Sequence, residues 1–289
     1  MKVLLALAVL ATSATALAAD NREIQDIMYL PNTGTTYGFS TIQITNGEEK
    51  ADAGDTETTG YNLTQSIGHS FTDRFLLQAD LSYADFESDD DSVGGTKTNQ
   101  TGISDPTISA RFRTMDESFR WDVIAGATLG FVDREQDSDG DLNNHQGGSS
   151  LFVGTQFGGK SESFQWAILG LLTHNREATV DVDGLGDVDL DANNELLTRL
   201  DVLSRLGDKS FLRSNVAANF AEGYEDDQSP SQEFAAPETT YSIGTEFQHL
   251  ISKDLMLRAG VDYSIANRSS GQVDDITAWN FLGGANYQF

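Results

Sequence analysis

Three things are scarce in this sequence, and each scarcity excludes a class of protein. The 289 residues include no cysteine, so an exported form of the chain cannot be held together by disulfide bonds. Beyond residue 18, no apolar run approaches the ~20 residues that a membrane-spanning helix needs, and the longest is residues 167–172. The 18 basic side chains are outnumbered by 45 acidic ones, which argues against binding to nucleic-acid phosphates. Disulfide-stapled scaffolds and helical membrane proteins are therefore excluded, and no nucleic-acid partner is expected.

Residues 1–18 have the pattern of a cleaved secretory signal. Lys2 precedes an apolar run, and small residues follow it as far as Ala16-Leu17-Ala18. We therefore predict an exported protein with a periplasmic segment over residues 19–34 and one fold over residues 35–289. The length requires no second domain.

From Thr35 onward, apolar and polar residues alternate with the period of two that is typical of β-strands. Two strands are weaker: in the first, Ile42 and Ile44 compete with Tyr37 and Phe39 for the apolar face, and in the second the apolar face is interrupted by Gln65 and His69. The alternation predicts twelve strands, at residues 35–47, 57–70, 74–86, 102–114, 119–133, 149–158, 163–182, 187–206, 210–223, 239–249, 254–267 and 276–289.

The connections between these strands are of two alternating kinds. Short turns such as residues 71–74 and 207–209 alternate with long acidic loops such as residues 87–101 and 133–148. Such an up-and-down meander has two unlike ends, as transmembrane barrels do. The arms on either side of the bend at residues 183–186 are longer than a membrane requires, so we expect this hairpin to project outward.

Alternation alone does not say whether the apolar face meets a protein core or lipid. In a soluble barrel of twelve strands, apolar side chains would have to fill a wide interior. Here the opposite face is rich in Gly, Ser and Thr, and aromatic residues lie near the ends of the apolar runs, as at membrane interfaces. A sheet in lipid must close on itself to satisfy its edges. We predict an all-β transmembrane antiparallel up-and-down β-barrel of about twelve strands, with short periplasmic turns and long acidic external loops, in the outer membrane of a Gram-negative bacterium.

The chain ends on WNFLGGANYQF, which resembles the carboxy-terminal targeting signal of bacterial outer-membrane barrels. The residues that carry the likeness are Trp279, Phe281, Tyr287 and Phe289. The resemblance implies recognition by the barrel assembly machinery and a final environment of outer-membrane lipid and lipopolysaccharide. The alternative is an ordinary last strand that ends on Phe.

Charged residues recur on the strand face opposite the apolar one. By parity this interior set is Asp80, Arg111, Arg113, Asp122, Arg199, Asp201, Arg213, Arg258 and Asp262. Charged rings are one means by which channels select solutes, so the set fits a pore for small polar or amphiphilic molecules. It fits equally a closed lumen whose charges pair, because a buried charge needs a partner. Two functions stay open: a passive channel or transporter, and a closed structural or surface-interaction barrel.

The acidic loops suggest a second kind of site. Asp137, Asp139 and Asp141 resemble the start of a calcium-binding loop, although the closing Glu is not in place. Divalent cations could bridge such carboxylates to each other or to lipopolysaccharide phosphates. The alternative is a set of solvated, mutually repelling loops.

Catalysis is not expected, and no cofactor is indicated. A lipase in a barrel wall needs a Ser activated by a nearby His. None of the four histidines has the His-x-Ser arrangement, and His69 and Ser70 are adjacent on a predicted strand, so they face opposite sides.

Residues 102–113, GISDPTISARFR, resemble a segment that recurs in outer-membrane transporters of the meta-pathway-of-phenol-degradation type. The residues that carry the likeness are Gly102, Asp105, Pro106, Ala110, Arg111 and Phe112, together with the approach to the first strand at residues 31–39. The resemblance implies uptake of hydrophobic or aromatic compounds, and it transfers no binding residue. Pro106, which lacks an N–H donor, also suits an ordinary strand start or bulge.

Overall fold

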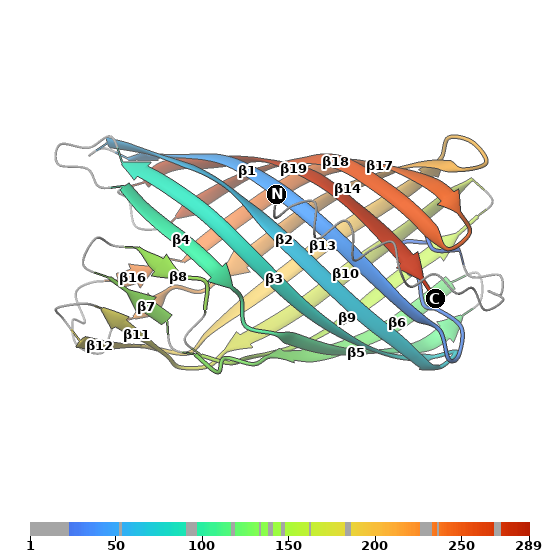
Figure 1. Ribbon diagram of the computed structural model, residues 1–289, viewed down its shortest axis with the longest axis horizontal. Coiled ribbons are helices and arrows are strands. Elements are labelled where there is room, and N and C mark those ends of the chain that lie inside the picture. The colour runs from blue at the N-terminus through green and yellow to red at the C-terminus, as the bar shows by residue number, and fades with distance from the viewer. Residues whose placement is uncertain are drawn as a thin grey trace.

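A computed structural model describes residues 23–289, apart from residues 52–53, 91–96, 117–118, 133, 138–140, 146–147, 162, 183–185, 226–232, 236 and 269–272. The strands form one closed antiparallel barrel (Figure 1). No helix in the described ranges is long and apolar enough to cross a membrane.

Twelve strands of the described chain make the barrel wall. They are β1 (Thr36–Ala51), β2 (Gly54–Thr72), β3 (Phe75–Asp90), β4 (Lys97–Ile103) continued by β5 (Thr107–Asp116), β6 (Phe119–Thr128), β9 (Ser150–Lys160), β10 (Phe164–Asn175), β13 (Asn193–Arg205), β14 (Ser210–Ala221), β17 (Glu238–Ser252), β18 (Leu255–Arg268) and β19 (Val273–Gln288). Each pairs with its neighbours in the chain, and β1 pairs with β19 to close the sheet. The predicted closed meander of about twelve strands is confirmed.

The fourth wall strand differs from the prediction of one continuous strand at residues 102–114. It begins at Lys97 and is interrupted between β4 and β5 by residues 104–106. Pro106 has no backbone N–H for the ladder, which suits its position directly before β5. Its carbonyl oxygen instead accepts a hydrogen bond from the backbone N–H of Leu129, at 2.9 Å.

The long-loop end carries extra sheet beyond the wall. The short strands there are β7 (Arg134–Gln136), β8 (Leu142–Asn143), β11 (Ala178–Val182) and β12 (Gly186–Leu190), with β15 (Tyr224–Glu225) and β16 (Glu233–Ala235) in a separate pair. The β11–β12 hairpin projects past β10 and β13, as predicted, although both predicted long arms are interrupted (Figure 1). The predicted strand at residues 119–133 ends at Thr128, and the loop that follows instead pairs β7 with β11 and β8 with β4. One long loop therefore contributes two short strands to the sheet at this end.

The outer face of the wall is apolar. Every wall strand exposes at least one large apolar side chain, and Ile44, Ile67, Ile243 and Phe281 each expose half or more of their surface. A protein surrounded by water rarely exposes so much contiguous apolar area, whereas a barrel in lipid requires it. The same exposures show which face of the first strand points outward, because Ile44 is 51% exposed and Tyr37 only 3%.

The buried apolar cluster lies inside the barrel, at the short-turn end. Its members are Ile24, Tyr29, Leu30, Tyr37, Leu76 and Met256. The first three belong to residues 23–34, which precede β1 and were assigned from sequence to a periplasmic segment. In the structure this segment, here called the N-terminal segment, lies within the barrel, where Tyr29 packs edge-on against Tyr37 at 5.7 Å between ring centroids.

Candidate functional site

The interior charges of β5 and β6 form a buried ion pair. Antiparallel pairing sets Arg113 directly opposite Asp122, and the two side chains are 1% and 0% exposed. The Arg113 guanidinium donates to both Asp122 oxygens, from Nε at 2.8 Å and from Nη2 at 3.0 Å. Arg111 approaches the same carboxylate, with Nε 2.8 Å from Oδ2. The guanidinium groups of Arg111 and Arg113 therefore both pair with the carboxylate of Asp122, which is buried away from water.

Both arginines also hold the N-terminal segment. Arg111 donates to the carbonyl oxygen of Tyr29, and Arg113 donates to that of Met28. Backbone acceptors inside a barrel need such partners because neither a strand ladder nor bulk water serves them. The segment is therefore attached to the wall by the same residues that form the ion pair.

Asp26 supplies the second attachment of the N-terminal segment. Its carboxylate accepts hydrogen bonds from Lys160 at 2.8 Å, from Gln165 at 2.7 Å and from Arg120 at 3.2 Å. The side chain is 3% exposed. We did not single out Asp26 from the sequence, and no motif marks it. The signal that could have done so is the apolar spacing around it, at Ile24, Met28 and Leu30.

Arg199, Asp201 and Arg213 form a second interior cluster, on β13 and β14. Asp201 is 1% exposed and accepts from Arg199 Nε at 2.9 Å and from Arg213 Nη2 at 2.8 Å. Arg199 lies two residues from Asp201 on the same strand face, and the β13–β14 pairing brings Arg213 across from the next strand. Two positive charges share one negative charge, so this triad carries a formal charge of +1.

Arg258 belongs to a third, neutral group. Its Nη1 donates to Glu246 at 3.3 Å and its Nη2 donates to the Thr41 hydroxyl. Gln248 donates to the other Glu246 oxygen at 2.7 Å. The pair links β17 and β18 to β1 across the interior face.

The two remaining interior acids are apart from these groups. Asp80 accepts from Gln78 at 2.8 Å, and Asp262 accepts a long contact from Asn280 at 3.5 Å. In the described chain neither carboxylate forms an ion pair. The structure thus gathers seven of the nine predicted interior charges into three groups, and leaves Asp80 and Asp262 among neutral polar side chains.

Sequence comparisons do not assign the chain to a family. No protein-family model matches it, and no curated protein sequence matches it. Solved structures do match its backbone. The COG4313 outer membrane channel from Pseudomonas putida F1 superposes with a TM-score of 0.71 at 13% identity, over 93% of this chain and 100% of that one. The translocator domain of the autotransporter NalP from Neisseria meningitidis gives 0.54 at 15% identity, over 89% of each chain.

A third structure agrees with these two. The transport unit of the autotransporter AIDA-I from Escherichia coli gives a TM-score of 0.53 at 10% identity, over 98% of this chain and 97% of that one. This chain has the fold of an outer-membrane β-barrel. At these identities the likeness establishes the barrel fold, and the predicted fold class is confirmed.

The four C-terminal aromatic residues of the predicted assembly signal occupy two different environments. Trp279 and Phe281 lie on the outer face and are 50% and 53% exposed. The rings of Tyr287 and Phe289 stack with centroids 5.9 Å apart. The backbone of Phe289 exchanges two hydrogen bonds with Thr36, at 2.8 and 3.1 Å, so the last residue helps to close the barrel. Their role as an assembly signal stays a prediction.

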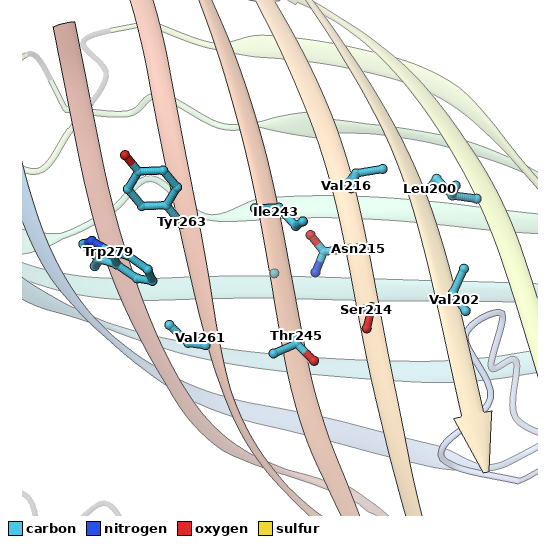
Figure 2. A pocket seen from close by; sticks show the side chains of 11 residues that line it. Leu200, Val202, Ser214, Asn215, Val216, Ile243, Thr245, Val261, Tyr263 and Trp279 are labelled. Atoms are coloured by element: carbon cyan, nitrogen blue, oxygen red, sulfur yellow. The ribbon is translucent and has the colours of Figure 1, made fainter. Parts of the chain in front are cut away.

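A hollow of about 450 Å³ lies on the outer face of the barrel, across β13, β14, β17, β18 and β19 (Figure 2). The residues that line it are Leu200, Val202, Ser214, Asn215, Val216, Ile243, Gly244, Thr245, Val261, Tyr263 and Trp279. The short side chains of Ser214 and Thr245 leave the space between larger neighbours. The hollow opens on the apolar outer surface, so it is separate from the charged interior.

A smaller pocket of about 190 Å³ lies at the long-loop end of the barrel. Its lining comprises Arg134, Gly148, Ser149, Asn175, Arg176, Ala178, Leu190 and Glu195. Asn175 donates to Glu195 at 2.9 Å, and both belong to the inward faces of their strands. The pocket therefore adjoins the interior where the β11–β12 hairpin begins.

The acidic triplet proposed as a cation site is only partly visible, because Asp139 lies outside the described residues. Asp141 accepts from the backbone N–H of Asn99 at 2.6 Å and from its amide at 3.1 Å. Asp137 accepts from the backbone N–H of Asp141 at 3.0 Å. These bonds join the loop to β4, and the described residues contain no group of three potential metal ligands.

Proposed function

We propose that this protein is a passive channel for small solutes in the outer membrane of a Gram-negative bacterium, with its long acidic loops outside and its short turns in the periplasm. The location is supported by the apolar outer face, which requires hydrocarbon around it. It is also supported by the structures that share the fold, one of which is named as an outer membrane channel.

One observation favours an open channel over a barrel whose interior is filled by side chains. Arg199 and Arg213 point inward, yet their side chains keep 34% and 22% of their exposure, while Asp201 between them keeps 1%. Inward side chains remain exposed only where the interior at that level has room for water molecules. A lumen packed shut by its own side chains would have buried both guanidiniums.

The N-terminal segment limits the path at the short-turn end. Its attachments are hydrogen bonds and ion pairs through Asp26 and through two backbone carbonyls. A solute that leaves this end must pass beside the segment or displace it. Pore width and the charges around it then set which solutes pass.

Hydrophobic or aromatic compounds are the proposed solutes. The resemblance of residues 102–113 to transporters of the phenol-degradation type supports this class. The interior does not oppose it, since half-buried apolar side chains such as Phe152 and Leu171 lie on inward strand faces.

Planar-bilayer conductance and liposome swelling test the proposal with the processed chain, using a panel of sugars, organic acids and aromatic compounds. We expect ion conductance and measurable flux of at least one solute class. Arg199→Asp should shift ion selectivity toward cations, because it changes the sign of an exposed interior charge. Absence of both conductance and solute flux would end the channel proposal.

The same experiment tests a closed barrel with a structural or surface role, whose acidic loops bind cations or partners. The occupation of the short-turn end by the N-terminal segment favours this alternative. If it is correct, Arg199→Asp lowers stability and produces no change in ionic current.

A further inference from the structure

The inward face of the barrel has an apolar strip on one side. Five half-buried apolar side chains from four adjacent strands form it: Ile124 of β6, Phe152 of β9, Leu169 and Leu171 of β10, and Leu197 of β13. Their strand positions alternate with outward residues such as Ile168, Leu172 and Leu200, which are exposed on the outer face. These five residues are called the apolar strip below.

Glycines make the apolar strip continuous. The Phe152 ring lies over Gly126 of the next strand, and the Leu171 side chain lies over Gly154, where a Cβ would come within 2.7 Å of it. Leu171 is also paired directly with Leu197. Side chains from β9 and β10 therefore cover the positions at which the neighbouring strands have none.

The positive triad lies at one end of the apolar strip. Leu169 is paired directly with Arg199, and Leu197 precedes Arg199 by two residues on the same face. From the level of Arg199 to that of Phe152, which is paired with Thr173, the strip extends for four residues along β10. At the rise of a β-strand this is roughly 13 Å.

Arg199 has hydrogen-bonding capacity left over. Its Nε donates to Asp201 at 2.9 Å, and in the described chain its two Nη groups bond to no acceptor. Asp201 is shared with Arg213, so one of the two positive charges is not neutralised. A planar guanidinium with two free NH2 groups matches a carboxylate, to which it can donate two parallel hydrogen bonds.

We propose that Arg199 and the apolar strip together bind amphiphilic organic anions, in which one carboxylate is joined to an aromatic ring or a short alkyl chain. The carboxylate would bind Arg199, and the apolar part would lie along Leu169, Leu171 and Phe152 toward the long-loop end. This inference deepens the proposed channel function, on which it rests, because it gives the path a solute site and a solute class.

Equilibrium dialysis of radiolabelled ligands against the processed chain in lipid nanodiscs tests the site, with empty nanodiscs as the blank. The ligands are 4-phenylbutyrate, its neutral counterpart 4-phenylbutanol, and butyrate, which lacks the ring. We expect saturable binding of 4-phenylbutyrate that exceeds that of either companion, because only this ligand satisfies both the guanidinium and the strip.

Three variants separate the two contributions. Arg199→Gln should weaken 4-phenylbutyrate binding about tenfold or more, as expected for a lost charge-assisted hydrogen bond, and leave 4-phenylbutanol nearly unchanged. Leu171→Asn should weaken both ring-containing ligands. Arg205→Gln is the matched control, because it removes the same charge from the same strand at an exposed turn position, and it should change neither.

The site is overturned if 4-phenylbutyrate binds no more than it does to empty nanodiscs, or if Arg199→Gln behaves like Arg205→Gln. Should Arg199→Gln fail to fold, Arg199→Lys serves in its place, because it keeps the positive charge and removes the paired guanidinium donors. An unchanged affinity for butyrate and 4-phenylbutyrate in this variant would also refute the proposed contact between the guanidinium and the carboxylate. Flux through liposomes without saturable binding would remove this site and keep the channel. Saturable binding without flux would remove the channel and keep the site.

Discussion

Replacing Asp122 with Asn is the sharpest test of the interior electrostatics. The carboxylate is 0% exposed, and it faces Arg113, which is 1% exposed, and Arg111, which is 18% exposed. Removing one partner of a buried ion pair leaves the other charge uncompensated and costs about 3–5 kcal/mol. Arg113 keeps hydrogen bonds to the Met28 carbonyl and to Asp116, so we expect the lower end, about 3 kcal/mol.

The measurement is urea unfolding of the protein in lipid vesicles, followed by fluorescence of its three tryptophans. Asp208→Asn is the control, because Asp208 is fully exposed at a turn and its ion pair with Arg205 spans 3.8 Å. We expect this control to change the free energy of unfolding by less than about 0.5 kcal/mol.

A second substitution shows whether the loss arises from unpaired charge. Arg113→Met alone should destabilise the barrel, because it breaks the same pair. In the Asp122→Asn background the same change should be stabilising or neutral, since it removes a buried guanidinium that has lost its nearest counter-charge and keeps only the longer 3.3 Å contact to Asp116. If Arg113→Met costs as much in both backgrounds, or if Asp122→Asn behaves like Asp208→Asn, the reasoning is refuted.

Three further predictions concern the N-terminal segment, the last residue at the β1–β19 closure, and the packing of Phe152 on Gly126. Asp26→Lys should release the N-terminal segment, because it opposes Lys160 with a like charge, and single-channel conductance should rise several-fold. Phe289→Ala should lower the fraction of protein that reaches the heat-modifiable barrel form on electrophoresis, because it removes the ring that stacks on Tyr287 where the sheet closes. Gly126→Ala should cost about 1–3 kcal/mol in urea unfolding, because its methyl group would overlap Phe152 and a backbone carbonyl.

The first and third of these predictions have a matched control, and the second has a refuting outcome of its own. Glu23→Gln removes an exposed partner of Lys160 and should leave single-channel conductance near the original value. If Glu23→Gln and Asp26→Lys changed the conductance equally, Asp26 would not be the residue that attaches the N-terminal segment. Unchanged assembly of Phe289→Ala would contradict a role of the Phe289 ring in assembly. Gly170→Ala adds a methyl group with nothing within 4 Å, so the packing account fails if Gly126→Ala is no less stable than Gly170→Ala.

The sequence predicts which charged residues face the barrel interior, but it does not predict which of them contact each other. Parity assigns Arg113 and Asp122 to one face, because successive strand side chains point to opposite sides. It does not say that they are directly opposite each other, since that depends on the register, and a slip of one residue would separate them. Asp80 and Asp262 have the same parity as the arginines but lie away from them, because their levels in the barrel differ.

Local pattern also failed where long-range contacts decide the structure. Tyr37 and Ile44 are equally apolar in a strand pattern, and only their exposures in the closed barrel, 3% and 51%, show which of them faces inward. The loop at residues 133–148 was predicted as a long acidic connection without strands, whereas part of it forms β7 and β8 against strands that are distant in the chain. These pairings depend on which segments the closed barrel brings together.

The sequence by itself determined the approximate positions of the wall strands, their one apolar and one polar face, and the unlike ends, because these follow from the alternation of neighbouring side chains and from the lengths of the connections. Tertiary structure alone decided that residues 23–34 occupy the barrel and that Asp26 binds Gln165, 139 residues away in the chain. The physical reason is that such contacts form only after the sheet has closed, when the burial of Ile24, Tyr29 and Leu30 offsets the entropy lost in ordering the segment.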